Sequence, residues 1–405
     1  MPGLALGSPR VVIVGGGPAG TTTALALAHE APEWADRVVV LEKATYPRDK
    51  PCAGAVGGRA DRLLAELGVT VHVPSVTIDG FSVRTRAADR TVAPGAVGRV
   101  VRRIEFDHAL ARAVIARGIT VRDGVCVDEV HEEGPVVRIG TQHGAVTADV
   151  AVGCDGVGSL LRRAMGASPG PLRAQVIEVD TPPLPSDRPR HLIHFDASDP
   201  ALAGYVWDFP TEVGGEALVC RGVYRVRIDG DGDAEPLAAL LARRLEALGV
   251  ASTCGRNKRY AERGFDDVTR YASARCMLVG EAAGIDALTG EGIAQAIEYG
   301  VLAGRFLARK LRASPAGPID VSDWHDAVRR SRLARDLRLR ALVFRAYHGA
   351  WRDEIERFFA DVPEALAVGA GHFAARPADW LEVGHVAALA AARAASAIVA
   401  RSLRG

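Results

Sequence analysis

Three glycines and one acidic residue near the N-terminus have the spacing of a dinucleotide-binding site. An apolar strand expected over residues 11–14 runs directly into Gly15, Gly17 and Gly20 of the motif GGGPAG. In such a motif the first glycine permits a tight turn, the second admits a pyrophosphate close to the backbone, and the third lets the helix lie close to the strand. Glu42 lies 22 residues after Gly20, at the end of a second apolar strand, where a carboxylate accepts hydrogen bonds from ribose hydroxyls.

A glycine-rich stretch alone would equally suit a flexible turn, so the flanking elements decide between the two interpretations. A helix expected over residues 19–30 and a second strand over 37–41 complete a strand–helix–strand unit in the right order. The free N–H groups and the positive dipole end of that helix would face the pyrophosphate. The complete unit favours dinucleotide binding.

The composition is that of a soluble protein and argues against some classes of function. With 405 residues, 48% of them hydrophobic, the chain can bury two or more cores, so two packed domains are expected. The 50 basic residues balance the 49 acidic ones without a long block of one sign, so nothing favours nucleic-acid binding. We expect no metal site and a reduced, cytoplasmic protein, because no CxxC pair or disulfide framework is formed by Cys52, Cys126, Cys154, Cys220, Cys254 and Cys276.

No targeting or membrane-spanning segment is expected. The residues before the first strand lack the charged and apolar regions of a signal peptide. Residues 11–28 are uncharged, but their glycines, proline and threonines fit a nucleotide-binding turn better than a membrane span. The helix expected over residues 385–403 has an apolar side diluted by alanine, which favours packing on the second domain over peripheral contact with a membrane. Both interpretations of that helix stay open.

The chain is expected to divide into three parts. A discontinuous nucleotide-binding domain would comprise residues 1–70, 100–168 and 266–315, with an antiparallel excursion at 120–152. A β-rich domain would comprise 71–99 and 169–265, followed by a helical region over 316–405. Strands are expected at 175–180, 191–196, 204–209 and 216–228, and helices at 59–67, 106–117, 235–248, 293–311, 324–347 and 351–360.

Two further stretches could contact a ligand. The loop over residues 46–58 has two prolines and three glycines around Cys52, and it suits either a planar ligand or a surface connection with Cys52 as a small buried residue. Tyr205, Trp207 and Phe209 alternate along one expected strand and share one face. Such a stripe is more often core than binding wall, but only 5% of the residues are aromatic, which raises the odds for a planar or apolar ligand.

Two more glycine-containing turns follow expected strands. In the first, Asp155 could lie over the GGGPAG turn. In the second, residues 280–284 and 289–292 precede a long helix whose dipole could stabilise negative charge on a reduced ring system. A charged residue at the end of a strand and a second helix N-terminus suit a long ligand that is polar at both ends.

Together these motifs resemble a family. GGGPAG with Glu42, Arg103-x-x-x-Asp107, Cys154-Asp155-Gly156 and Gly280-Glu281-Ala282-Ala283-Gly284 resemble, in order, the FAD-dependent superfamily of aromatic hydroxylases, flavin halogenases and geranylgeranyl reductases. The resemblance spans residues 11 to about 310. Pro51-Cys52-Ala53-Gly54 and Tyr205-Val206-Trp207-Asp208-Phe209-Pro210 are similar to the PCxG and YxWxFP signatures of the geranylgeranyl reductase branch. The Gly-Glu-Ser loop and WxWxIP segment usual in halogenases do not occur.

The resemblance implies an α/β fold, with a Rossmann-like FAD-binding domain of the glutathione-reductase type, an interleaved β-sheet substrate domain and a helical C-terminal region. It implies that Cys52, Tyr205 and Trp207 line the substrate side as catalytic residues. Two departures from the family pattern concern the flavin: Glu281 replaces the usual aspartate, and the following loop is one residue shorter, with Ala287 where proline is frequent. The implied FAD-binding residues are Gly15, Gly17, Pro18, Ala19, Gly20, Glu42, Lys43, Cys52, Ala53, Gly54, Arg103, Val125, Asp155, Gly156, Ser159, Gly280, Glu281, Gly290, Gly292 and Ile293.

Three functions are compatible with this resemblance. The favoured one is reduction of a carbon–carbon double bond in an apolar, isoprenoid-like substrate, with hydride from the reduced flavin and a proton from Tyr205 or water. The alternative is a monooxygenase acting on an aromatic or polyketide-like substrate, and the third is a non-catalytic redox sensor. No second GxGxxG motif occurs, so NAD(P)H would bind transiently or another protein would supply electrons. The oligomeric state is not determined by these motifs.

Overall fold

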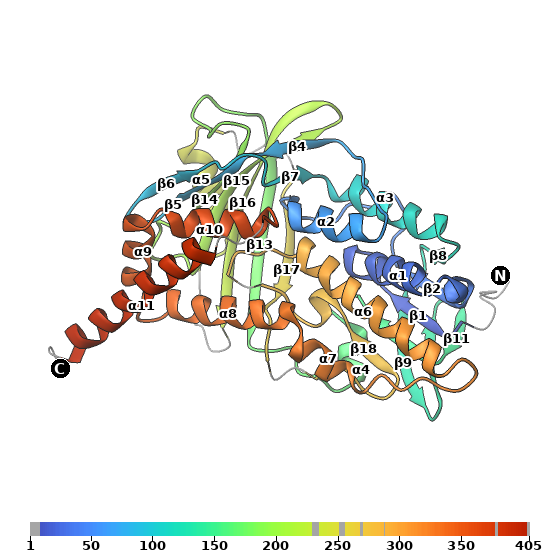
Figure 1. The fold of residues 1–405 in the computed structure, drawn as a ribbon. Coiled ribbons are helices and arrows are strands. Elements are labelled where there is room, and N and C mark those ends of the chain that lie inside the picture. Colours follow the sequence, from blue (N-terminus) through green and yellow to red (C-terminus); the bar gives the residue numbers. More distant parts are fainter. Residues whose placement is uncertain are drawn as a thin grey trace.

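A five-stranded parallel sheet, in the order β18-β12-β1-β2-β8, carries the glycine motif (Figure 1). The computed structural model describes residues 9–228, 235–250, 256–267, 270–286, 288–376 and 380–402. Strands β1, β2 and β12 are buried on both faces, as unbroken apolar sequences require. The strands are Val11–Val14 (β1), Val38–Leu41 (β2), Thr120–Arg122 (β8), Val150–Gly153 (β12) and Cys276–Leu278 (β18). The helical elements of this part are α1 (Pro18–Glu30), η1 (Pro32–Arg37), α2 (Gly58–Glu66), α3 (Arg103–Ala116), α4 (Leu160–Ala164), η2 (Gly280–Ala282) and α6 (Ile293–Ala313).

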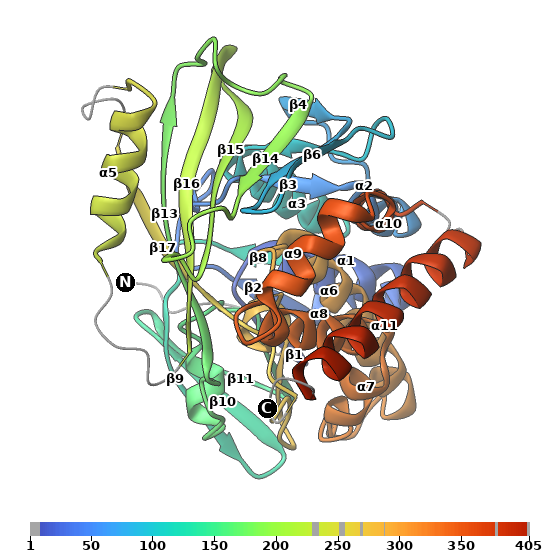
Figure 2. The ribbon, with the colours of Figure 1, turned by 90° about the vertical axis from the view of Figure 1, so that its left-hand side faces the viewer.

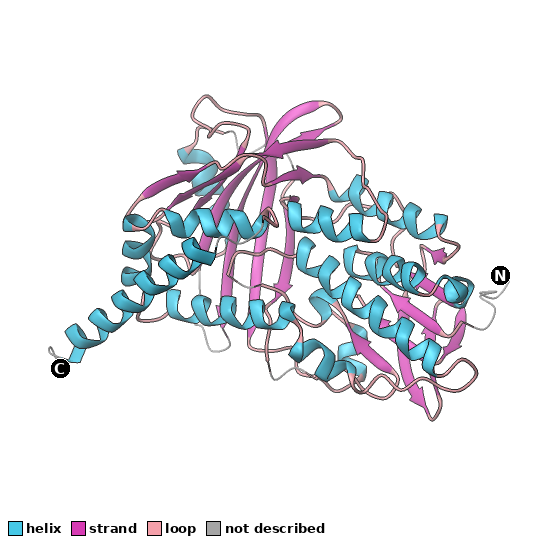
Figure 3. Ribbon diagram, viewed as in Figure 1, coloured by secondary structure: helices cyan, strands magenta, loops and turns pink. Residues whose placement is uncertain are grey.

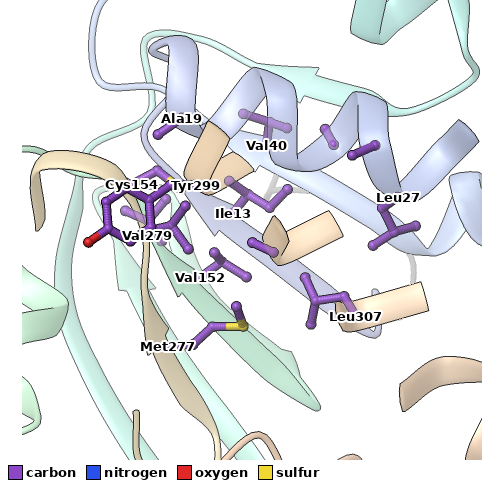
Figure 4. Close-up of a cluster of buried hydrophobic side chains, with 14 of the residues drawn as sticks. Ile13, Ala19, Leu27, Val40, Val152, Cys154, Met277, Val279, Tyr299 and Leu307 are labelled. Atoms are coloured by element: carbon purple, nitrogen blue, oxygen red, sulfur yellow. The ribbon is translucent and has the colours of Figure 1, made fainter. Parts of the chain in front are cut away.

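The core of this part lies between the parallel sheet and helices α1 and α6 (Figure 4). Ile13, Val40 and Val152 come from three adjacent strands, Leu27 comes from α1, and Leu307 comes from α6. All five side chains are completely buried. This packing makes the carboxyl edge of the sheet a rigid platform for whatever binds there.

A seven-stranded mixed sheet, β17-β13-β16-β15-β14-β5-β6, forms the second part (Figure 3). Neighbouring strands are antiparallel except β14 and β5, which run parallel. Helix α5 (Leu237–Ala247) lies on one face of this sheet (Figure 2). Leu241 and Leu245 of α5 pack on that face, while the aromatic residues of β15 lie on the other face. Its strands are β5 (Gly80–Arg84), β6 (Asp89–Val92), β13 (Leu172–Thr181), β14 (Leu192–Asp196), β15 (Gly204–Val213), β16 (Glu216–Ile228) and β17 (Lys258–Arg263).

Two small sheets complete the β structure and refine the expected strand limits. The antiparallel excursion expected over 120–152 is shorter than predicted, because β8 at its start and β12 at its end join the parallel sheet instead. The excursion contains β9 (Val127–Glu133), β10 (Val136–Thr141) and β11 (Gly144–Ala148), and the other small sheet contains β3 (Ala55–Gly57), β4 (Ser75–Ile78) and β7 (Gly98–Val101).

The C-terminal region is helical, as expected, but it contains more helices than the sequence indicated. The helix expected over 324–347 is interrupted at Ser331, whose extended backbone ends α7 and whose Oγ accepts a hydrogen bond from the Ala334 N–H at 3.0 Å, capping α8. Helix α11 packs against α9 and α10 and then extends away from the body (Figure 1). No helix in the described part of the chain is long and apolar enough to cross a membrane. The helices are α7 (Trp324–Arg330), α8 (Arg332–Tyr347), α9 (Arg352–Asp361), α10 (Glu364–Phe373), which was not expected, and α11 (Trp380–Ser402).

Candidate functional site

The turn after β1 is closed by contacts that only glycine allows. Gly15 has φ +104°, and a Cβ there would lie 2.2 Å from the carbonyl oxygen of Cys154. A Cβ on Gly20 would lie 1.9 Å from the carbonyl oxygen of Gly15. A side chain at either position would therefore push β1, α1 and β12 apart, so these glycines hold the N-terminus of α1 at the edge of the sheet.

Gly17 faces a cavity that two arginines border. A Cβ added to Gly17 would have guanidinium atoms of Arg48 and Arg103 as its nearest neighbours, at 3.7 and 3.9 Å. Arg103 donates two hydrogen bonds to buried Asp107, at 2.6 and 2.7 Å, and Arg48 lies 2.9 Å from the same carboxylate. Although burial opposes it, the Asp107 carboxylate raises the pKa of Arg103, which stays charged. Two oriented guanidiniums beside a helix N-terminus suit a pyrophosphate.

Glu42 directly follows β2 and is only 5% exposed. Its carboxylate accepts hydrogen bonds from the N–H groups of Gly16, at 2.9 Å, and Ala44, at 3.0 Å. Arg48 also approaches it, at 3.3 Å. These bonds hold the carboxylate against the cavity, where it could accept hydrogen bonds from a ribose.

We expect Glu42→Ala to weaken FAD binding by about 1–3 kcal/mol, the scale of a lost charge-assisted hydrogen bond. Fluorescence titration of the FAD-free protein with FAD measures the dissociation constant. Glu42→Gln is the matched control, because it keeps one acceptor oxygen and should lose less affinity. An unchanged dissociation constant in Glu42→Ala would place the ribose contact elsewhere.

On the far side of the turn, Asp155 and Glu281 each have one carboxylate oxygen that receives no hydrogen bond from the described residues. Asp155 accepts the Leu160 N–H at 2.6 Å through Oδ2, and Glu281 pairs with Lys50 at 3.2 Å through Oε2. The other oxygens, Asp155 Oδ1 and Glu281 Oε1, are buried and have no hydrogen-bond partner among the described residues. Sugar hydroxyls would satisfy them, and buried acceptors without donors cost free energy. The residues around the glycine turn therefore fit a flavin dinucleotide.

A continuous cavity of about 1040 Å³ extends from this turn toward the C-terminal helices. Its middle is walled by aromatic side chains of the seven-stranded sheet. Tyr205, Trp207 and Phe209 share one face of β15, with the rings of Tyr205 and Trp207 6.3 Å apart and those of Trp207 and Phe209 6.4 Å apart. Tyr224 of β16 stacks on Tyr205 at 4.9 Å with an interplanar angle of 11°.

The far end of the cavity is formed by α8, α9 and α10. Tyr347, Phe359, Leu366 and Phe373 contribute largely apolar surface there. Burial lowers the pKa of nearby His348 to about 4, so its imidazole is neutral at pH 7. The cavity thus offers a polar end at the nucleotide turn and an apolar end under the helices.

The loop that contains Cys52 lies between these two ends. The Cys52 N–H donates to Oε1 of Glu178 at 2.9 Å, and the thiol borders the cavity. Burial raises the pKa of the Cys52 thiol, which therefore remains protonated at pH 7. Burial also raises the pKa of Glu178 to about 7.

The segment from Asp286 to Gly292 is tied to a C-terminal helix. Arg340 of α8 lies 2.7 Å from Asp286 and 2.8 Å from Glu291. Tyr205 donates a hydrogen bond to the Thr289 carbonyl at 2.6 Å. Ala287, the departure noted in the sequence, lies outside the described residues. The contacts of Arg340 and Tyr205 hold this segment at the junction of the polar and aromatic parts of the cavity.

We expect Arg340→Gln to destabilise the protein by about 3 kcal/mol, because it removes the counterion of two buried carboxylates. Asp286 is completely buried, and the Glu291 side chain is only 9% exposed. Arg338→Gln on the same helix is the control, since its partner Asp267 is 43% exposed and an exposed pair contributes less than about 1 kcal/mol. Urea unfolding of both variants measures the difference, and equal midpoints would contradict this role of Arg340.

Glu262 is a further carboxyl group in the wall of the cavity. It lies on β17, and its buried Oε2 has no hydrogen-bond partner among the described residues. Burial raises the pKa of Glu262 to about 8, and the neighbouring Glu281 carboxylate adds to the effect. The group is therefore largely protonated at neutral pH.

The structure brings most of the predicted site residues together. All of them line the cavity except Gly20, Ser159 and Gly280. Gly20 makes the close helix contact described above. Ser159 is completely buried and accepts a hydrogen bond from the Arg162 N–H at 3.0 Å, which caps α4. Gly280, with φ +67°, packs against Ala19, so close packing explains why this residue is a glycine.

Sequence reasoning missed several residues that border the cavity. Arg48 and Lys50 lie in the loop that was singled out, so only their roles were overlooked. Glu262 and Arg340 lie outside any motif. For Glu262 the available signal was its alternation with Tyr260, two residues earlier on the same strand, which also lines the cavity. Nothing in the sequence around Arg340 indicated its partners.

We call the glycine turn together with Glu42, Arg48 and Arg103 the dinucleotide clamp. This clamp, joined to an apolar cavity, defines the chain as an FAD-dependent oxidoreductase. Residues 9–320 match the model of the FAD binding domain family, and the chain belongs to that family. The predicted membership of the hydroxylase, halogenase and geranylgeranyl reductase superfamily is confirmed, as is the predicted fold class.

Three similar proteins illustrate the relationship. A digeranylgeranylglycerophospholipid reductase from Methanothrix thermoacetophila is 29% identical over 362 residues, covering 83% of this chain and 87% of that protein. A menaquinone reductase from Mycobacterium tuberculosis is 28% identical over 324 residues, covering 74% of this chain and 76% of that protein. The crystal structure of a geranylgeranyl bacteriochlorophyll reductase-like protein from Thermoplasma acidophilum has the same fold, with a TM-score of 0.75 and 20% identity, covering 95% of this chain and 100% of that one.

Proposed function

We propose that this oxidoreductase reduces a carbon–carbon double bond in an apolar, isoprenoid-like substrate. The observation that carries the proposal is the cavity, which joins the dinucleotide clamp to an aromatic wall and ends in apolar surface under α8–α10. Such a cavity suits a long apolar chain with its reactive end near the flavin. The two related reductases named above, of a digeranylgeranyl lipid and of menaquinone, support the same substrate class.

In this proposal FAD lies across the edge of the parallel sheet. Gly15, Gly17 and Gly20 shape the turn for the pyrophosphate, Arg48 and Arg103 neutralise its charge, and Glu42 accepts from the ribose. The other contacts are those that the family resemblance implies, including Asp155 and Glu281. We retain the division into 1–70, 100–168 and 266–315 for FAD, 71–99 and 169–265 for substrate, and 316–405 for the helical region.

The chain's own residues would prepare the substrate for reaction. When bound, FAD supplies hydride chemistry. The side chains of Tyr205 and Trp207 would hold the double bond and exclude water, while Cys52, as a neutral thiol, would contribute contact without a charge. The N-terminus of α6 at Gly292 and Ile293 would favour negative charge on the reduced cofactor.

Anaerobic mixing experiments test the function. The protein is loaded with FAD, reduced with dithionite and mixed without oxygen with polyprenyl compounds of increasing chain length and with menaquinone. We expect return of the oxidised flavin spectrum and a product two hydrogens heavier by mass spectrometry. No reaction with any of them would overturn the proposal.

Mixing the same reduced protein with oxygen separates the remaining functions. Incorporation of an oxygen atom into an aromatic compound would establish the monooxygenase instead. Reduction and reoxidation of the flavin without turnover of any acceptor would point to a redox sensor. Comparing NADH, NADPH and protein electron donors in the reductive step identifies which of them reduces the flavin.

A further inference from the structure

Helix α9 lies at the apolar end of the cavity, far from the parallel sheet that carries the glycine turn (Figure 1). Two of its side chains, Ile355 and Phe359, line the cavity. Because these residues are four apart, they lie on the same face of the helix, one turn from each other. This face of α9 therefore meets the part of a bound molecule that is most distant from the dinucleotide clamp.

A buried carboxylate fixes α9 in this position. Glu356 is 2% exposed and is the only buried residue of this fully described helix. It accepts hydrogen bonds at 3.1 and 3.4 Å from Arg86, which lies in the turn between β5 and β6. Arg352 donates to it at 2.8 Å, and Tyr347 of α8 donates to it at 3.4 Å. Because separating a buried carboxylate from its partners is costly, these bonds hold α9 to the seven-stranded sheet and to α8.

Two further hydrogen bonds connect α9 to the same sheet. Near the start of the helix, Arg352 also donates to the carbonyl of Ala197, directly after β14, at 2.9 Å. Near its end, the carbonyl of Ala360 accepts a hydrogen bond from Arg90 of β6 at 2.8 Å. Since both ends of α9 are held as well as its middle, the helix forms a fixed wall.

A fixed apolar wall limits how much of a long chain the cavity can bury. Each methylene group that is buried tightens binding about fourfold, whereas a methylene group left in water adds almost nothing. The affinity for a series of chains should therefore rise with length until the chain reaches Ile355 and Phe359, and then stop rising.

We propose that Ile355 and Phe359 form the end wall of the substrate cavity and set the greatest length of isoprenoid chain that it accommodates. The inference rests on the proposed function for the class of substrate. It adds the residues that select among substrates of that class, and it assigns Glu356 as the positioning residue that holds them in place.

The test measures the binding of prenyl alcohols of one to four isoprene units to the FAD-loaded protein in its oxidised form, which cannot reduce them. Isothermal titration calorimetry gives each dissociation constant. In the wild type, each added unit should tighten binding at least about 10-fold until the chain reaches the end wall, and the next unit should tighten it less than about 2-fold.

Two variants should move this limit in opposite directions. Phe359→Ala removes a ring about as large as one isoprene unit, so the first chain beyond the wild-type limit should bind at least about 10-fold tighter than it does to the wild type. Ile355→Trp places a larger side chain in the cavity, so the longest chain that the wild type accommodates should bind at least about 10-fold more weakly.

Phe358→Ala is the matched control, because Phe358 is the neighbouring phenylalanine of α9 and does not line the cavity. Its length limit should equal that of the wild type. FAD content and the melting temperature establish that each variant is folded. If Phe359→Ala does not fold, the comparison of Ile355→Trp with Phe358→Ala decides the question.

The same alcohols, offered to the reduced protein as acceptors, separate this inference from the proposed function. A wild type that binds them with a length limit but reduces none would overturn the proposed function and support the end wall. Affinity that rises through all four units in the wild type, or an equal limit in Phe359→Ala, Ile355→Trp and Phe358→Ala, would overturn the end wall alone. A wild type that binds none of the alcohols would overturn the end wall and the substrate class together.

Discussion

Gly17→Val is expected to give a protein that folds normally and contains no FAD. The nearest atoms to a Cβ at this position are 3.7 and 3.9 Å away, at the ends of two arginine side chains, so the folded chain can accommodate the substitution. Gly17 has φ −76°, which valine adopts without strain. The isopropyl group would, however, occupy the space between Arg48 and Arg103, where the pyrophosphate is proposed to lie.

The measurement is the ratio of flavin to protein after purification, together with thermal unfolding of the FAD-free forms. The FAD-free variant and the FAD-free wild type should differ by less than about 0.5 kcal/mol in the free energy of unfolding. Added FAD should raise the melting temperature of the wild type only, since a ligand that binds the folded state stabilises it.

Gly371→Val is the matched control, because Gly371 of α10 also has open space around an added Cβ but does not line the cavity. This variant should retain FAD. A full complement of FAD in Gly17→Val would contradict the placement of the pyrophosphate.

Trp207→Ala is expected to abolish most substrate turnover while the protein keeps its FAD. Trp207 is 2% exposed, and its indole fills the space above Gly222, where a Cβ would lie 2.1 Å from the ring. Its removal enlarges the middle of the cavity, so a substrate would no longer be held against the flavin. The lost packing should also reduce the free energy of unfolding by about 3–5 kcal/mol.

Two comparisons separate the loss of turnover from the loss of stability. Trp324→Ala removes a completely buried tryptophan that donates to the Leu278 carbonyl at 2.9 Å but does not line the cavity. It should lose comparable stability and keep turnover per bound flavin at a temperature where both variants are folded. Cys52→Ala should impair turnover with a smaller loss of stability, because it removes less buried surface. Normal turnover in both Trp207→Ala and Cys52→Ala would place the substrate elsewhere.

The nucleotide end of the site could be predicted because its parts are close in sequence. Gly15, Gly17, Gly20 and Glu42 all belong to one strand–helix–strand unit, whose geometry follows from the spacing of its own residues. The aromatic face of β15 was predictable for the same reason, since alternation along one strand decides which side chains share a face. In these stretches local backbone geometry determines which side chains meet.

The remaining parts of the site depend on which elements become neighbours in space. Arg48 and Arg103 meet at Gly17 because the loop after β2 and the start of α3 both reach the carboxyl edge of the sheet. Glu262 enters the cavity because β17 pairs with β13 at the end of the seven-stranded sheet. No short motif encodes such pairings, since they result from the burial of whole sheets and helices against one another.

The sequence by itself therefore determined the family, the fold class and the strand–helix–strand unit with its glycine turn, because the motifs that encode them each lie within a single structural unit. Only the tertiary structure decided that α8–α10 close the apolar end of the cavity, that Arg340 holds the segment beside the proposed flavin site, and that Glu262 lies next to Tyr224. Those contacts join residues from different sheets and helices, and a buried charge or acid is defined by everything packed around it rather than by its neighbours in the chain.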